Sequence, residues 1–141
     1  MSLSKKVIFL AVPFALSGCL NLEQMQLPQL PDITQPKEPI SASLSKICSD
    51  TDRNPVSSLH TYKNKQLETT GTVTSISEGF NPQFRVIIKA GQTSIYAQSN
   101  NPSTIKHLSK GQRVKVKGTV YDLSTNYPGC TITLKDSDFI K

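Results

Sequence analysis

From residue 66 onward the sequence consists mainly of five segments that are rich in β-branched residues or alternate apolar and polar positions. Such segments are typical of strands that bury one face and expose the other. The expected strands cover residues 66–77, 84–90, 93–98, 113–123 and 130–140. A short helix beginning at Asn101-Pro102 is expected between the third strand and the fourth. A chain of 141 residues with this pattern has room for one small, mainly β domain.

Two of these segments carry a glycine in a similar setting. Gly71 lies in Thr-Gly-Thr-Val and Gly118 lies in Lys-Gly-Thr-Val. Because glycine lacks a Cβ, its place inside a long strand predicts a bulge or a sharp bend. A small barrel needs such bends, since its first strand must pair with both halves of the sheet. The pattern therefore predicts a five-stranded barrel.

Two helical segments are expected before the barrel. The first begins near Ser41, and one of its faces holds Leu44, Ile47 and Cys48. The second begins at Pro55, with Asn54 as its N-cap. One side of this second helix holds Val56, Leu59 and Tyr62.

The N-terminus has the pattern of an export signal. Lys5 and Lys6 precede an apolar run over residues 7–16, which is too short to remain in a bilayer as a spanning helix. The following Leu-Ser-Gly-Cys at residues 16–19 resembles the bacterial lipobox. That resemblance implies cleavage before Cys19 and acylation of its sulfur and amine with chains such as palmitate. The alternative is an ordinary signal peptide followed by an unrelated cysteine.

The lipobox resemblance also implies where the protein resides. Several buried acyl chains, each contributing ~0.8 kcal/mol per CH₂, form an effectively permanent anchor. Leu20 rather than Asp after the acylated cysteine implies transport to the outer membrane of a Gram-negative cell, with the domain facing the periplasm. We expect a signal peptide over residues 1–18, a lipidated cysteine and tether over 19–40, and a folded domain over 41–141.

The expected tether is rich in proline, with four prolines among residues 20–40. Proline removes backbone donors and favours extended conformations, so neither helix nor sheet is expected there. The segment either holds the domain away from the membrane or serves as a docking arm for a partner protein. In the second case the apolar anchors are Leu27, Leu30 and Ile33.

The folded part resembles the tRNA_anti-like family of OB-folds. The matching segments lie at residues 62–65, 71–73, 108–112, 114–118 and 131–134. The resemblance spans residues 42–141 and implies a five-stranded OB-fold barrel preceded by a helical segment. These segments are structural, so they bear on the fold more than on the activity.

The cysteines and histidines indicate structure rather than chemistry. Cys48 and Cys130 remain once Cys19 is acylated, and an even pair in an exported domain favours a disulfide. Two buried free thiols are the alternative. His60 and His107 lie in different segments without a ligand at metal-binding spacing, and Asp136 and Asp138 are expected to be solvated. The sequence predicts no enzyme, no metal site and no cofactor.

OB-folds commonly bind ligands over strands 2 and 3 and through the loops that join strands 1–2 and 4–5. On this chain that surface holds Phe80, Asn81, Arg85, Ile87, Lys89, Tyr96, Asn126 and Tyr127. Aromatic rings beside cations stack on flat groups and attract anions. A separate basic row formed by Arg113, Lys115 and Lys117 on the fourth strand is expected to be a solvated face that discourages aggregation.

The leading hypothesis is a non-enzymatic binding or scaffold module in the cell envelope. The net charge is +6, and the fourteen basic and ten acidic residues that remain after cleavage leave +4. That charge is modest for a nucleic-acid binder, and an exported domain rarely meets RNA, so we expect an envelope protein or glycan as partner. The alternatives are an accessory lipoprotein of a secretion or conjugation apparatus, and an oligosaccharide or nucleic-acid reader.

Overall fold

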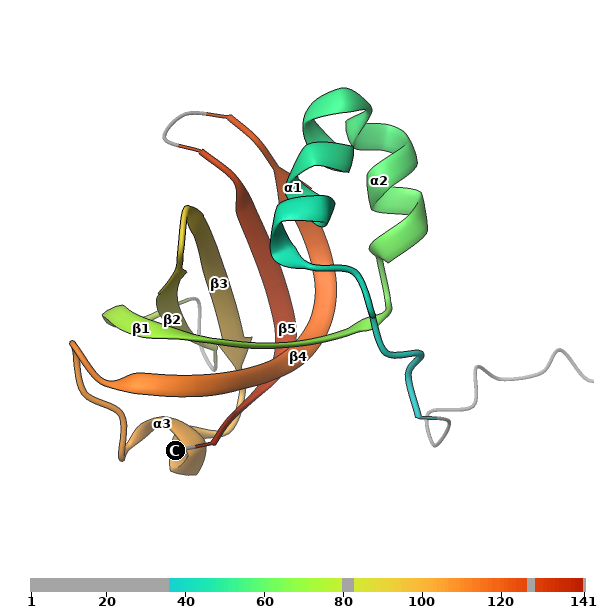
Figure 1. Cartoon of the computed structure of the whole chain (residues 1–141). Coiled ribbons are helices and arrows are strands. Elements are labelled where there is room, and N and C mark those ends of the chain that lie inside the picture. The colour runs from blue at the N-terminus through green and yellow to red at the C-terminus, as the bar shows by residue number, and fades with distance from the viewer. Residues whose placement is uncertain (1–35, 80–82, 127–128, 141) are drawn as a thin grey trace, which may run out of the picture. The chain divides into compact units, whose positions relative to one another are not determined.

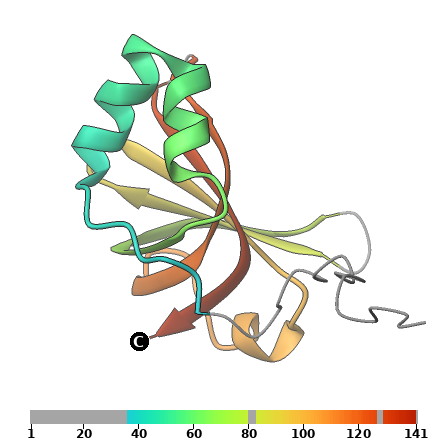
Figure 2. The same cartoon turned by 90° about the vertical axis from the view of Figure 1, so that its right-hand side faces the viewer.

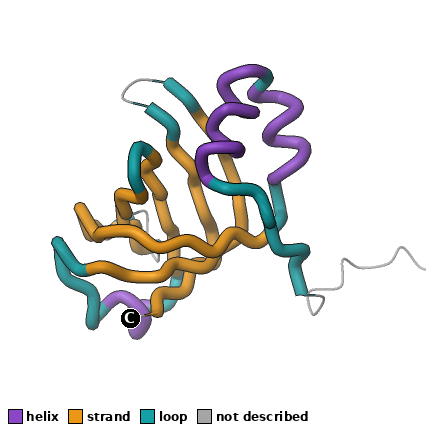
Figure 3. Tube along the Cα trace, viewed as in Figure 1, coloured by secondary structure: helices purple, strands orange, loops and turns teal. Residues whose placement is uncertain are grey.

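The computed structural model describes residues 36–79, 83–126 and 129–140. Its elements are, in chain order, α1 (Leu44–Arg53), α2 (Pro55–Tyr62), β1 (Gln66–Glu78), β2 (Phe84–Ala90), β3 (Thr93–Ser99), α3 (Pro102–Ile105), β4 (Arg113–Ser124) and β5 (Thr131–Ile140). The two leading helices lie beside a sheet that curls upon itself (Figures 1 and 3). No end of a strand differs from the expected end by more than one residue. Within the described ranges, no helix is both long and apolar enough to cross a membrane.

The sheet is a closed barrel with the strand order β1-β2-β3-β5-β4. β1 pairs with both halves of the sheet, because its residues 66–72 pair with β4 and its residues 72–78 pair with β2. All neighbouring strands are antiparallel except β3 and β5, which run parallel over four residue pairs. The expected five-stranded OB-fold barrel with a preceding helical segment is therefore confirmed.

Of the two glycines, Gly118 lies at an irregularity in strand pairing, as expected, whereas no bulge lies at Gly71. Thr74 is the extra residue in β1, Tyr121 is the extra residue in β4, and β5 carries a bulge opposite Gly118. The glycines also allow strands to approach closely. A Cβ on Gly71 would lie 2.5 Å from the carbonyl oxygen of Lys89, and one on Gly118 would lie 2.8 Å from the Ser137 hydroxyl.

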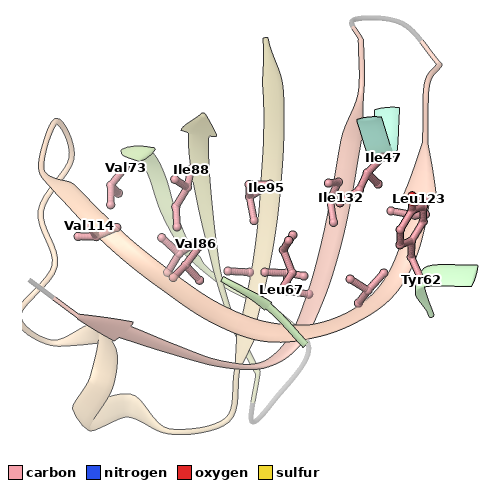
Figure 4. Packing of buried hydrophobic residues seen from close by; sticks show 14 of the residues in the cluster. Ile47, Tyr62, Leu67, Val73, Val86, Ile88, Ile95, Val114, Leu123 and Ile132 are labelled. Carbon is pink, nitrogen blue, oxygen red and sulfur yellow. The ribbon is translucent and has the colours of Figure 1, made fainter. Parts of the chain in front are cut away.

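The core fills the barrel and extends beneath the helices (Figure 4). Its inward rows contain buried apolar side chains from every strand, and α1 and α2 add Ile47 and Tyr62. Val56 was expected on the apolar side of α2 with Leu59 and Tyr62, but it is 78% exposed and does not belong to the core.

The helices are held together by a polar cluster and a covalent bond. Asp50 accepts hydrogen bonds from the Lys46 ammonium and from the Tyr62 hydroxyl, both at 2.7 Å. These bonds hold the pKa of the Asp50 carboxyl below its ordinary value and raise the pKa of Tyr62. A disulfide joins Cys48 of α1 to Cys130, directly before β5, which excludes the alternative of two free thiols.

Residues 36–40, which we call the strap, contact the barrel. Gln66 donates a backbone hydrogen bond to Glu38 at 2.9 Å, and Ile40 donates one back to Gln66 at 2.8 Å. The Lys37 ammonium donates to the Thr119 hydroxyl at 2.7 Å. Figures 1 and 2 show this part of the chain running from α1 along the outside of the barrel. The domain boundary at residue 41 stays a prediction.

Candidate ligand-binding face

The outer side of β2 and β3 brings together the residues expected on these strands. Val86 and Ile88 are fully buried in the barrel, so the alternation of the strand directs Arg85, Ile87 and Lys89 outward. The register sets these three opposite Gln98, Tyr96 and Ser94 of β3, respectively. We call the surface formed by these six side chains the β2–β3 face.

Neighbouring strands widen this face. Ser75 of β1 lies opposite Ile87, and Thr133 of β5 lies opposite Tyr96. The middle row therefore crosses four strands and presents hydroxyl groups on either side of an apolar and an aromatic residue. Sequence reasoning missed Thr133, because alternation directs it outward but does not reveal that β5 runs parallel beside β3.

The face carries two cations and one aromatic ring. The Arg85 guanidinium carbon lies 6.0 Å from the centroid of the Tyr96 ring, at the outer range of a cation–π contact. The Lys89 ammonium donates a hydrogen bond to the Ser94 hydroxyl at 3.0 Å. Residues 84–99 contain no Asp or Glu, so neither strand supplies a charge that would repel an anion.

An open cleft lies between α1 and the turn that joins β2 to β3. Its volume is about 420 Å³, and it is lined by Leu44, Ser45, Ala90, Gly91, Gln92, Thr93, Gly129 and the two bonded cysteines. Ala90 and Thr93 belong to the inner rows of β2 and β3, so the cleft lies at the turn between these strands and on the other side from Lys89 and Ser94.

The expected loop residues are only partly described. Asn126 is exposed in the β4–β5 loop, and its backbone N–H donates to the Ser124 hydroxyl at 3.3 Å. Phe80, Asn81 and Tyr127 lie outside the described residues, as does Cys19. Their contributions to ligand binding and anchoring stay predictions.

The other polar residues considered from the sequence lie apart from this face. On β4, Arg113 and Lys115 are exposed, and Lys115 forms an ion pair with Glu68 at 3.1 Å, as expected for a solvated strand face. The exposed histidines lie on α2 and after α3. Asp136 faces Lys37 at 3.6 Å. No group of three metal-binding side chains occurs within residues 36–79, 83–126 and 129–140.

The family model of tRNA_anti-like proteins matches residues 1–137. This chain belongs to the tRNA_anti-like family. Its members contain OB-fold binding domains, which agrees with the barrel and with a face suited to binding. The match extends over residues 1–40 as well as the barrel.

Solved structures share the fold of this tRNA_anti-like protein. One is the crystal structure of a Klebsiella pneumoniae protein named a "putative nucleic acid-binding lipoprotein", with 19% identity and a TM-score of 0.55. The similarity covers 70% of this chain and 89% of that one. An Entamoeba histolytica asparaginyl-tRNA synthetase is more weakly similar, with 14% identity, a TM-score of 0.40 and coverage of 55% and 21%. No curated protein matches the sequence.

Proposed function

We propose that this tRNA_anti-like protein is an exported lipoprotein, acylated at Cys19, whose OB-fold domain is a non-enzymatic binding module for an anionic glycan of the cell envelope. The β2–β3 face is the proposed binding surface, with Arg85, Lys89 and Tyr96 as its main contacts. The observation that carries the proposal is the placement of two cations beside an aromatic ring on two strands without an acid. Phe80 and Tyr127 are proposed to add loop contacts.

A glycan suits this face for chemical reasons. The Tyr96 ring offers a flat surface for a sugar ring, while Arg85 and Lys89 attract its acidic groups. The hydroxyl groups of Ser75, Ser94 and Thr133 lie in the neighbouring positions and both donate and accept hydrogen bonds.

The proposed address rests on the N-terminal sequence. The lipobox at residues 16–19 and Leu20 support an outer-membrane anchor with the domain in the periplasm. The Klebsiella protein with the same fold is also named a lipoprotein. Labelling of cells with radioactive palmitate tests the anchor, and the Cys19→Ser variant is its control. An unlabelled wild-type protein would contradict the proposed acylation.

The binding test uses the oxidised chain beginning at Leu20. Its affinity for acidic and neutral glycan fragments is measured by titration calorimetry for the wild type, Arg85→Ala and Tyr96→Ala. Arg113→Ala is the matched control, because this exposed cation lies on β4. We expect each face variant to lose about tenfold in affinity, equivalent to one charged hydrogen bond or stacking contact, and the control to bind as the wild type. Equal binding by all four proteins would contradict the assignment of the face.

Single-stranded nucleic acid is the second candidate ligand. The name of the Klebsiella protein favours it, and stacking on Tyr96 beside cations suits bases as well as sugars. This candidate runs against our expectation from the exported address and the modest charge. Binding to an oligonucleotide with a steep salt dependence, abolished by Arg85→Ala and Tyr96→Ala, would favour nucleic acid over the glycan. The docking-arm alternative rests on Leu27, Leu30 and Ile33, which lie outside the described residues.

A further inference from the structure

A second aromatic and basic surface lies on the opposite side of the barrel. It consists of Lys63 after α2, Tyr121 of β4 and Lys135 of β5, and we call it the Tyr121 patch. The ammonium groups of Lys63 and Lys135 each lie 5.6 Å from the centroid of the Tyr121 ring. The three residues come from separate elements, so no single stretch of sequence indicates that they meet.

The barrel fixes the Tyr121 ring at its outer surface. Tyr121 is the bulged residue of β4, between the buried Val120 and the exposed Asp122, and it is 50% exposed. Among the described carboxylates, none forms an ion pair with Lys63 or Lys135. Even with Asp122 beside it, the patch therefore has an excess of positive charge around a half-exposed ring.

The strap leaves the barrel next to this patch. Lys37 donates its hydrogen bond to Thr119, which lies two residues before Tyr121, about 7 Å along the strand. Lys37 also lies 3.6 Å from Asp136, the neighbour of Lys135. The chain that continues toward Cys19 thus starts from the same outer surface of β4 and β5.

The strand order places the patch away from the β2–β3 face. In a closed ring of the order β1-β2-β3-β5-β4, the strand across from the boundary between β2 and β3 is β4. Figure 1 shows the strap on one side of the barrel and β2 and β3 on the other. Lys135 lies on β5, two residues after Thr133, so β5 separates Tyr121 from Tyr96. A surface that contacts β4 therefore leaves the side chains of β2 and β3 open, although it approaches the part of the ligand face that lies on β5.

We infer that the Tyr121 patch contacts the anionic headgroups of the membrane that holds the lipid anchor, an inference that rests on the proposed acylation of Cys19. Lysine ammonium groups are attracted to anionic lipid, and a tyrosine ring is suited to the boundary between headgroups and acyl chains. The proposed anchor ties the strap to the membrane, and Lys37 of the strap contacts Asp136, the neighbour of Lys135. The contact orients the barrel with its ligand face toward the periplasm.

A single tryptophan reports on this contact, because the natural sequence contains none. The full-length acylated protein is reconstituted into vesicles that contain brominated lipid, with either phosphatidylglycerol and phosphatidylcholine or phosphatidylcholine alone. The Tyr121→Trp variant reports on the patch and the Tyr96→Trp variant reports on the opposite face. We expect stronger quenching of the patch reporter than of the opposite-face reporter in the anionic vesicles, and loss of this excess in neutral vesicles or at high salt.

Charge variants in the Tyr121→Trp background identify the groups responsible. Lys63→Gln with Lys135→Gln is expected to reduce the quenching to the level of the opposite-face reporter. Lys106→Gln with Lys110→Gln, which removes the same charge from exposed positions between β3 and β4, is expected to leave the quenching unchanged. Equal quenching of both reporters in attached protein would overturn the inference. Attachment of the protein to neutral vesicles depends on the acyl chains alone. If the protein does not attach to them, the proposed acylation of Cys19 is contradicted.

Discussion

Removal of the disulfide tests how the helical segment is held to the barrel. Cys48 and Cys130 are separated by 82 residues. Cross-linking a loop of that length removes unfolded-state entropy worth about 4.5 kcal/mol at 25 °C in the chain-entropy treatment. Ile47 and Tyr62 remain buried without the bond, so the helices should stay docked. We therefore expect Cys48→Ala/Cys130→Ala to fold but to lose about 4 kcal/mol and at least about 15 °C in Tm.

Urea unfolding followed by circular dichroism measures this loss. The oxidised wild type, the wild type in reductant and the double-alanine variant are compared at neutral pH. The reduced wild type and the variant should agree, because both lose the same cross-link while the helices keep their buried side chains. A loss below about 1 kcal/mol would refute the entropic reasoning. Loss of helical signal before urea is added would instead show that burial of Ile47 and Tyr62 cannot hold the helices.

Three further changes probe the barrel and the helix pair. Gly118→Ala is expected to lower the free energy of unfolding by about 1–3 kcal/mol in urea, because its Cβ would meet Ser137 and Leu134 at 2.8 and 3.0 Å. Ser137→Ala should change the free energy of unfolding by less than about 1 kcal/mol, because the buried Ser137 hydroxyl has no hydrogen-bond partner among the described residues. A larger loss would contradict this prediction. The lowered pKa of Asp50 predicts that the wild type is more stable than Asp50→Asn above pH 3.8, and that this advantage is lost as the pH falls through the lowered pKa. A difference in unfolding free energy between the wild type and Asp50→Asn that stays constant with pH, measured by the same urea unfolding, would contradict this prediction.

Local sequence patterns predicted the elements because each pattern is set by neighbouring residues. The alternation in residues 84–90 and 113–123 fixes which side chains enter the core, and Val86 and Val116 are indeed fully buried. Asn54 accepts the hydrogen bond from the Ser57 backbone that a helix cap requires. The same alternation placed Arg85, Lys89 and Tyr96 on one outer face.

Features that depend on strand pairing were not predictable from these patterns. Alternation does not reveal which strand lies beside β5, so Thr133 was missed beside Tyr96. The bulge at Tyr121 and its two lysines depend on the register between β4 and β5. The strap was expected to be part of a tether, because prolines argue against continuous sheet, yet one bridge from Pro39 to Gln66 is compatible with a proline.

The distribution of acidic residues explains why one face of this barrel suits an anion. In a closed barrel each strand pairs on both sides, so a partner must bind to side chains rather than extend the sheet. β1, β4 and β5 each carry at least one Asp or Glu, whereas β2 and β3 carry none. The cations Arg85 and Lys89 therefore act on a ligand without opposition from their own strands. Because the strap lies against β4, a membrane on that side would leave these cations exposed to solvent.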